Sequence, residues 1–292
     1  MKKIALYENP SKPEARKWAE YAARKIIALN AVCYASQELI DSFPDELASQ
    51  TIACPISNFE KFIDVVISFG GDGTMLTVSR ILVNADIPIM GFNVGKLGFL
   101  AEYSTCEIDE SLNDLISGNY RIVDRAILET EINGETIYAL NDFVIEKKNS
   151  SRMITIEAFS NQHCIGIYRA DGLIITTPTG STAYSLSCGG PIIAPSTQVI
   201  CLTPISPHSL TFRPLVIPDT TELAIKASSG SNVVNFVADG QTERLLKSGE
   251  QVVIKRSKEL CKLIKPLNSS YFDLLREKLL WAADGTSHNP KQ

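Results

Sequence analysis

Apolar residues in the first 120 positions of the chain form two alternating kinds of pattern. Short continuous apolar runs are typical of strands buried on both faces, and they lie at 4–7, 32–35, 65–69 and 87–92. Segments with helical periodicity lie at 13–29, 36–48, 75–84 and 107–117, the second of them interrupted near Pro44. Regular alternation of strands and helices predicts a parallel sheet with helices on both faces.

The pattern changes near residue 120 and becomes a series of short alternating segments. Residues 126–132 and 135–139 flank Asn133-Gly134, which is typical of a hairpin with a type I′ turn. Further alternating segments lie at 153–159, 164–169, 173–177, 222–227, 233–238 and 251–255. Clear helical periodicity returns at 271–281, so the region before it is predicted to be rich in β-structure.

Together these patterns predict a two-domain chain of the α/β plus β class. A Rossmann-like α/β nucleotide domain is expected at 1–121, completed by an amphipathic C-terminal helix at 270–281. A β-sandwich-like domain is expected at 122–269, followed by a polar tail at 282–292. Parallel α/β sheets bind ligands beyond the carboxyl ends of their strands. The residues that follow the apolar runs are therefore the first place to look for a site.

Composition and charge argue against several classes of function. The chain has 292 residues, 45% of them hydrophobic, and its net charge of −5 gives no electrostatic reason to expect nucleic-acid binding. Its seven cysteines show no Cys-x-x-Cys spacing, so neither a disulfide framework nor a zinc ribbon is expected, and a reducing cytoplasm is the simplest setting. Three histidines make a multi-histidine metal site improbable. No run approaches the ~20 apolar residues of a membrane span, so no membrane association is expected.

The segment Gly70-Gly71-Asp72-Gly73-Thr74 is the hardest to explain by folding alone. Its glycines allow a ligand to approach the backbone closely, and a helix expected to begin at Thr74 would present free N–H groups to a phosphate. A carboxylate beside a phosphate repels it, so Asp72 indicates a chemical role. The alternative is that Asp72 is a turn residue or a helix N-cap. Neither the P-loop nor the Gly-x-Gly-x-x-Gly pattern is present here.

This loop resembles the signature of NAD kinases, and four further stretches resemble the same family in the same order. They are Asn93 to Leu100, Leu140-Asn141-Asp142, Asp171-Gly172 with 177–187, and Asp239-Gly240-Gln241. Phosphofructokinases and diacylglycerol- and sphingosine-type lipid kinases carry similar glycine loops. The sequence Thr-Pro-Thr-Gly-Ser-Thr-Ala-Tyr at 177–184 is more specific to NAD kinases.

The resemblance implies that the chain transfers the γ-phosphoryl group of ATP to the 2′-hydroxyl of the adenosine ribose of NAD, which gives NADP. It implies that Asp72 accepts the hydroxyl proton. It also implies a phosphate site formed by Gly70, Gly71, Gly73 and Thr74. A divalent metal, Mg²⁺, is expected to be carried mainly by the triphosphate rather than by protein ligands.

The resemblance further implies a set of NAD contacts from both domains, with NAD bound between them. The expected contacts are Asp72, Gly73, Phe99, Asn141, Asp142, Arg152, Arg169, Asp171, Thr182, Ala183, Tyr184, Ser185, Leu186, Ser187 and Gln241. The family usually has Asn-Glu where this chain has Asn141-Asp142, so the acid is one methylene shorter.

Each of these positions also has a plain structural interpretation. The pair Asn141-Asp142, the Asp171-Gly172 pair and the Asp239-Gly240-Gln241 segment are all compatible with ordinary turns. Arg152 and Arg169 are compatible with solvated surface charges, and 177–187 with a loop that caps a short helix.

Two rival functions stay open at the level of sequence. One is a lipid kinase of the diacylglycerol type, and the other is a dinucleotide sensor without turnover. The family resemblance also implies a homodimer or homotetramer that associates through the β-rich domain. The sequence leaves open whether polyphosphate can replace ATP and whether NADH is also accepted.

Overall fold

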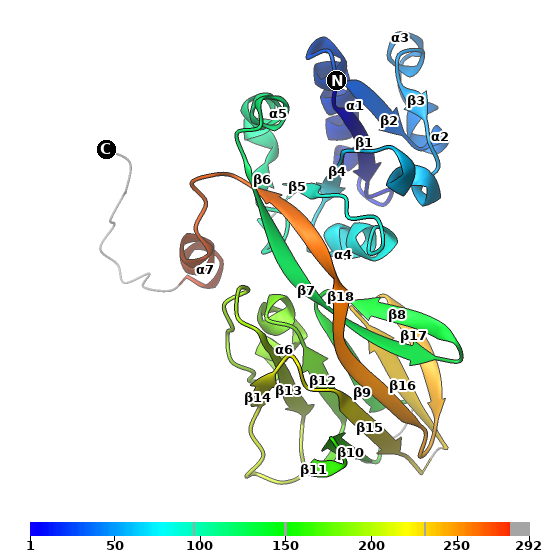
Figure 1. Cartoon of the computed structure of the whole chain (residues 1–292), viewed down its shortest axis with the longest axis vertical. Helices are drawn as coiled ribbons and strands as arrows, with labels where there is room; N and C mark the ends of the chain where they lie inside the picture. The colour runs from blue at the N-terminus through cyan, green and yellow to red at the C-terminus, as the bar shows by residue number, and fades with distance from the viewer. Residues whose placement is uncertain (96, 149–150, 231, 281–292) are drawn as a thin grey trace. The chain divides into compact units, whose positions relative to one another are not determined.

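The computed structural model describes residues 1–95, 97–148, 151–230 and 232–280, and the chain divides into two compact units (Figure 1). Unit 1 contains Met1–Met75, Pro88–Val123 and the described residues from Leu263 onward. Unit 2 contains Leu76–Ile87 and Asp124–Lys262. The predicted polar tail at 282–292 lies outside the described residues.

Unit 1 is built on a parallel sheet with the strand order β5-β4-β1-β2-β3. Its strands are β1 (Lys3–Glu8), β2 (Val32–Ala35), β3 (Ile52–Ala53), β4 (Val65–Gly70), β5 (Ile89–Asn93) and the short β6 (Tyr103–Ser104). The end of β18 (Gln251–Lys265) pairs with β5 through Leu263 and Ile264. The continuous apolar runs therefore form parallel strands, as predicted, and all six residues of β4 are buried.

The helices of unit 1 lie between or after these strands along the chain, and α4 begins in unit 1 and ends in unit 2. They are α1 (Pro13–Ala28), α2 (Gln37–Ile40), α3 (Asp45–Ala48), η1 (Ile56–Lys61), α4 (Asp72–Ile81), η2 (Thr105–Glu107), α5 (Ile108–Ser117) and α7 (Tyr271–Leu279). The α1 helix buries four alanines and Ile26, because small side chains allow close packing on the sheet. Its Tyr21 is 36% exposed and donates to Asp109.

Two helices differ from the sequence expectation. The segment 36–48 forms two short helices, since Pro44 supplies no N–H group to continue the first and instead begins the second. Helix α4 begins at Asp72, two residues before the expected start at Thr74. Asp72 is therefore in the first turn of the helix.

Unit 2 contains two antiparallel sheets. One has the order β14-β13-β12-β9-β16-β17 and the other contains β11-β10-β15-β18, with the β7–β8 hairpin paired to β18 (Figure 1). The bounds are β7 (Arg121–Ile132), β8 (Glu135–Ala139), β9 (Asp142–Lys147), β10 (Ile154–Ser160), β11 (His163–Ala170), β12 (Gly172–Thr176), β13 (Val199–Ile205), β14 (Leu215–Pro218), β15 (Leu223–Ser228), β16 (Val233–Ala238) and β17 (Thr242–Lys247). Two short helices, η3 (Thr179–Thr182) and α6 (Tyr184–Ser187), follow β12.

The core of unit 2 lies between the sheets, which confirms the predicted sandwich. Phe143 on β9 and Phe236 on β16 have ring centroids 5.0 Å apart, and they share one buried cluster with Ile156 on β10 and Ile225 on β15. The β7–β8 turn has positive φ at both central residues, 54° at Asn133 and 78° at Gly134. This is the geometry that a type I′ turn requires.

Among the described residues, no helix is both long enough and apolar enough to span a membrane.

Candidate active site

The glycine loop of unit 1 joins buried strand β4 to helix α4. A Cβ atom on Gly70 would lie 2.1 Å from Thr74 Oγ1, so a larger residue would displace the threonine. The carbonyl group of Gly70 accepts from the N–H of Val94, at 2.7 Å. Tight packing at Gly70 thus fixes the point where the chain leaves the sheet and α4 begins.

The carboxylate of Asp72 is held by three backbone amides from a second loop. Its Oδ2 accepts from Phe99 N at 2.8 Å, and its Oδ1 accepts from Leu100 N at 3.0 Å and Ala101 N at 3.2 Å. The carboxylate therefore binds the 98–101 segment instead of capping its own helix. A fixed orientation of this kind is what a catalytic group requires.

Counting acceptor positions shows which oxygen of Asp72 is available to a ligand. An ionised carboxylate offers about four lone-pair positions, two on each oxygen. Two amides occupy Oδ1, whereas one occupies Oδ2. Within the described part of the chain, one acceptor position therefore remains, and it is on Oδ2.

Lys12 is a candidate functional residue that was not predicted from the sequence. A Cβ atom built on Gly71 would lie 3.8 Å from Lys12 Nζ, and Lys12 is exposed. Asn9, three residues earlier, donates from Nδ2 to Thr74 Oγ1 at 3.2 Å and from its backbone N–H to Phe69 O. The signal in the sequence was a lysine just beyond the first strand, since adjacent parallel strands end at one edge of the sheet.

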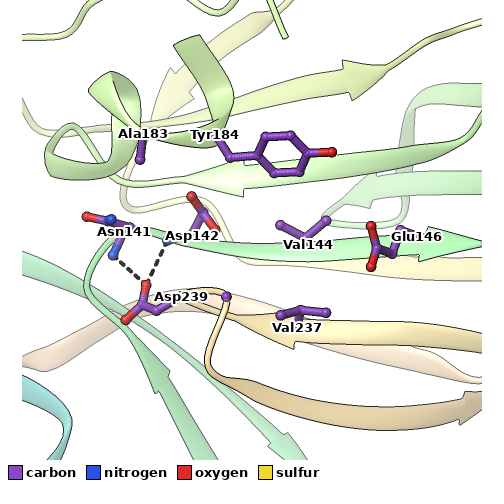
Figure 2. A pocket seen from close by; sticks show the side chains of 9 residues that line it. Asn141, Asp142, Val144, Glu146, Ala183, Tyr184, Val237 and Asp239 are labelled. Carbon is purple, nitrogen blue, oxygen red and sulfur yellow. Dashed lines mark hydrogen bonds between the residues drawn. The ribbon is translucent and has the colours of Figure 1, made fainter. Parts of the chain in front are cut away.

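Unit 2 has a cavity of about 320 Å³ beside strands β9 and β16 (Figure 2). It is lined by Asn141, Asp142, Val144, Glu146, Ala183, Tyr184, Val237, Asp239 and Gly240. Four of the predicted NAD contacts, at 141, 142, 183 and 184, therefore line one cavity. Its walls combine apolar side chains with three carboxylates, which suits a ligand with a flat ring and several hydroxyl groups.

Asp142 is the most unusual residue of this cavity. It is 4% exposed, and the described residues donate no hydrogen bond to its carboxyl group. Figure 2 shows that group on the side of β9 that faces Ala183 and Tyr184. Burial, and then the nearby charge of Asp239, raise the pKa of Asp142 to about 7. A buried carboxyl group without a partner is ready to bind ligand hydroxyls.

Asp239 has a supporting position on the other side of β9. Its carboxylate accepts from the amides of Leu140, Asn141 and Asp142, at 2.9, 2.7 and 3.1 Å (Figure 2). Burial raises the pKa of Asp239, while these amides and Arg80 act in the opposite direction. The sequence reading placed Asp239 in a motif but not among the contacts. The structure indicates that it fixes the start of β9.

Gln241 is held by helix α4 within unit 2. Its Oε1 accepts from Thr77 Oγ1 at 3.0 Å and from Arg80 NH1 at 3.1 Å, and the same guanidinium donates to Thr242. Arg80 thus brings a positive charge close to Asp239, which the sequence reading did not identify.

Other predicted contacts are placed differently. Asp171 forms an ion pair with Lys147, at 2.6 Å, and the hydroxyl group of Ser185 is buried against Thr203, at 2.8 Å. Arg152, Arg169 and Ser187 are exposed, as is Gly73, whereas Thr182 and Leu186 are partly buried. Phe99, in unit 1, is partly buried and has Lys278 Nζ 5.6 Å from its ring centroid. None of these side chains lines the cavity of unit 2.

Comparison with known proteins shows that two protein-family models match this chain. The ATP-NAD kinase N-terminal domain matches residues 4–120, and the ATP-NAD kinase C-terminal domain matches residues 140–266. A NAD kinase of Bacteroides fragilis is 43% identical over 232 residues, which are 78% of this chain and 79% of the relative. A NAD kinase of Sulfurimonas denitrificans is 38% identical and covers 96% of this chain and 98% of its own length.

Solved structures show a similar fold. The yeast NADH kinase complexed with NADH has a TM-score of 0.86 at 24% identity, with 100% of this chain and 90% of that chain covered. A NAD kinase from Archaeoglobus fulgidus in complex with ATP has a TM-score of 0.77 at 23% identity, with 96% and 99% covered.

Proposed function

Because this chain belongs to the NAD kinase family and is an ATP-dependent NAD kinase, we propose that Asp72 is the base of its reaction. The 2′-hydroxyl oxygen of the adenosine ribose of NAD forms a bond to the γ-phosphorus of ATP, and the bond to the ADP oxygen breaks. The hydroxyl proton moves to the carboxylate of Asp72. The products are NADP and ADP.

The observation that carries this proposal is the amide clamp on Asp72. Three backbone N–H groups fix the carboxylate and leave one acceptor position, on Oδ2. We therefore assign Oδ2 as the atom that receives the proton. A carboxylate fixed in this way loses little entropy when the substrate arrives.

For the donor phosphates, we propose contacts from Gly70, Gly71, Gly73 and Thr74, with Lys12 as a positive charge. Gly71 lies next to the Lys12 ammonium group, and the N-terminal end of α4 favours anions. Among the described residues, no three His, Cys, Asp or Glu side chains converge on a possible metal position. We propose that Mg²⁺ enters on the triphosphate, where it neutralises negative charge.

For the dinucleotide, we propose that the cavity of unit 2 holds a ribose and its base. Asp142 and Asn141 supply an acceptor and an amide for ribose hydroxyls, and Val144, Val237 and Tyr184 supply apolar surface. The shorter acid at 142 suits this role because its carboxyl group is buried and has no other hydrogen-bond partner among the described residues.

The remaining predicted contacts divide into two groups. Ser185, Asp171 and Gln241 already have protein partners, and we propose that they orient the loops around NAD. Direct NAD contacts from Gly73, Phe99, Arg152, Arg169, Thr182, Leu186 and Ser187 are proposed from the family resemblance.

The assay for this function is the formation of NADP by the purified protein with NAD, ATP and Mg²⁺. NADP is expected only when all three are present. A lipid kinase would form product only with a lipid acceptor, and a dinucleotide sensor would bind NAD without turnover. Replacing ATP with polyphosphate and NAD with NADH in the same assay determines the range of donors and acceptors.

We also propose that the chain is cytoplasmic and forms a homodimer or homotetramer through unit 2. Edge strand β14 supports the oligomer, since Leu215 and Val216 are 38% and 43% exposed on it. Light scattering on the protein as it elutes from a size-exclusion column is expected to give a mass of two or four times 32.0 kDa. The double substitution Leu215→Lys/Val216→Lys is expected to reduce that mass, and a 32.0 kDa wild type would contradict the proposal.

A further inference from the structure

Lys265, the last residue of β18, is a fully buried cation in unit 1. Its side chain is 2% exposed, and Nζ donates to Leu100 O at 2.8 Å and pairs with Glu102 Oε1 at 2.7 Å. The side chain of Glu102 is 14% exposed. Lysine is almost never this deeply buried without a partner. Leu100 belongs to the amide clamp on Asp72, and Glu102 directly follows it.

The bond from Lys265 reaches the clamp through a single peptide group. The carbonyl group of Leu100 and the N–H group of Ala101 belong to the same peptide plane. Lys265 Nζ donates to the oxygen of this peptide, and the N–H of the same peptide donates to Asp72 Oδ1 at 3.2 Å. A continuous line of hydrogen bonds therefore joins the ammonium group to the carboxylate.

A purely structural role is a weak explanation for this arrangement. Burying a lysine and a glutamate costs more desolvation energy than their attraction commonly returns, and well-packed apolar residues of similar size often replace such pairs without loss. Two apolar side chains would hold the end of β18 as well. They would not polarise the peptide that binds Asp72.

We propose that Lys265 is a positioning residue for the phosphoryl transfer, acting on Asp72 through the Leu100–Ala101 peptide. The inference rests on the proposed role of Asp72 as the base. A cation on a carbonyl oxygen strengthens the N–H of the same peptide as a donor, because linked hydrogen bonds polarise one another. The stronger N–H donor keeps Oδ1 hydrogen-bonded. The free acceptor position on Oδ2 therefore stays directed to the substrate.

The charges around this group define what a substitution would change. Glu102 neutralises Lys265, and Asp72 faces the same segment from α4. Burial, and after it the charge of Glu102, raise the pKa of Tyr103 on β6. On neighbouring elements, Lys278 of α7 lies over Phe99, and Arg121 of β7 donates to Pro266 O and Ser269 O. Among the described residues, Lys265 is the cation that binds the clamp itself.

The test is the dependence of kcat/KM on pH, measured as NADP formation at fixed saturating ATP. Lys265→Met keeps the length of the side chain and removes its charge. The carboxylate of Asp72 then loses a stabilising cation, so the acidic limb of the profile is expected to move up by about one pH unit. The value of kcat is expected to fall about tenfold, and Lys265→Arg, which keeps the cation, is expected to restore most of both.

Glu102→Gln makes the opposite change and keeps the test decisive if Lys265→Met does not fold. The amide oxygen of glutamine can still accept from Lys265, but the counter-charge is lost. The acidic limb is therefore expected to move to lower pH. The proposal would be overturned if the acidic limb of the pH profile of a folded variant matched that of the wild type, or if both substitutions moved it in the same direction.

Arg256→Met is the matched control. Arg256 pairs with buried Asp219 in unit 2, so its loss also leaves an acid without its cation, in an ion pair that shares no residue with the clamp on Asp72. Its acidic limb is expected to match that of the wild type, and titration of ATP itself is common to all the proteins. Full activity of Asp72→Asn would instead refute the base assignment, which is a separate outcome from an unmoved limb in Lys265→Met.

Discussion

A Cβ atom on Gly98 would lie 1.9 Å from Oδ1 of Asp72. Glycine at position 98 therefore allows the 98–101 segment to come close enough for its amides to bind the carboxylate. The glycine in one loop and the acid in another act as one structural unit.

Gly98→Ala is expected to reduce kcat by about a hundredfold, because the added methyl group must displace the carboxylate. The fold should persist, since the clash involves the end of one side chain. Gly230→Ala is the matched control, as a Cβ atom there meets nothing within 4 Å. Rates of NADP formation compare the two variants, and a normal kcat for Gly98→Ala would show that the carboxylate position is not critical.

Asp72→Asn is expected to lower kcat by roughly a thousandfold or more while the Kd for NAD changes only a few-fold. An amide cannot accept the proton, and one end of the side chain would present a donor to an amide N–H of the clamp. Isothermal titration with NAD and a turnover assay separate binding from chemistry. Asp109→Asn, at an exposed acid in the same unit, controls for loss of one negative charge.

Asp142→Asn tests the buried carboxyl group through the stability of the free protein. The pKa of Asp142 is raised from 3.8 to about 7, so the folded state holds a proton that the unfolded chain releases. The protonated Asp142 therefore makes its full contribution to the free energy of unfolding below about pH 4, and this contribution is lost as the pH rises through 7. At about 1.4 kcal/mol per pH unit, the loss approaches roughly 4 kcal/mol.

The asparagine variant lacks this loss, so its thermal stability should exceed that of the wild type at pH 8 by much more than at pH 4. Calorimetry at the two pH values measures the difference, and an equal gap at both would contradict the raised pKa. The variant should also bind NAD about tenfold more weakly, because a charged acceptor for ribose hydroxyls is gone.

Lys12→Ala is expected to raise the KM for ATP about tenfold and leave the Kd for NAD unchanged, since one charged contact to phosphate is lost. Lys17→Ala on α1 is the control, because Lys17 is exposed and pairs with Glu14. Steady-state kinetics at varied ATP distinguish the two variants. Equal KM values for both would place Lys12 outside the phosphate site.

Local pattern was sufficient for much of the fold. Continuous apolar runs identified the parallel strands β1, β2, β4 and β5 but not the two-residue strands β3 and β6, and Asn133-Gly134 identified its hairpin, because each of these signals lies within a few consecutive residues. Strands β9, β13, β14 and β17 were missed. Polar Asp142 opens β9, prolines lie in β13 and β14, and β17 is an edge strand in which three of six residues are charged.

The sequence by itself determined the two classes of domain, the glycine loop and the identity of the acid within it. Only the tertiary structure decided what surrounds each acid. Asp72 is held by amides that begin 27 residues later in the sequence. Asp142 lies beside Asp239, which is 97 residues away, and Lys265 binds Leu100, which is 165 residues away. The chemistry of a carboxyl group depends on its burial and its neighbours, and folding brings those neighbours from distant parts of the chain.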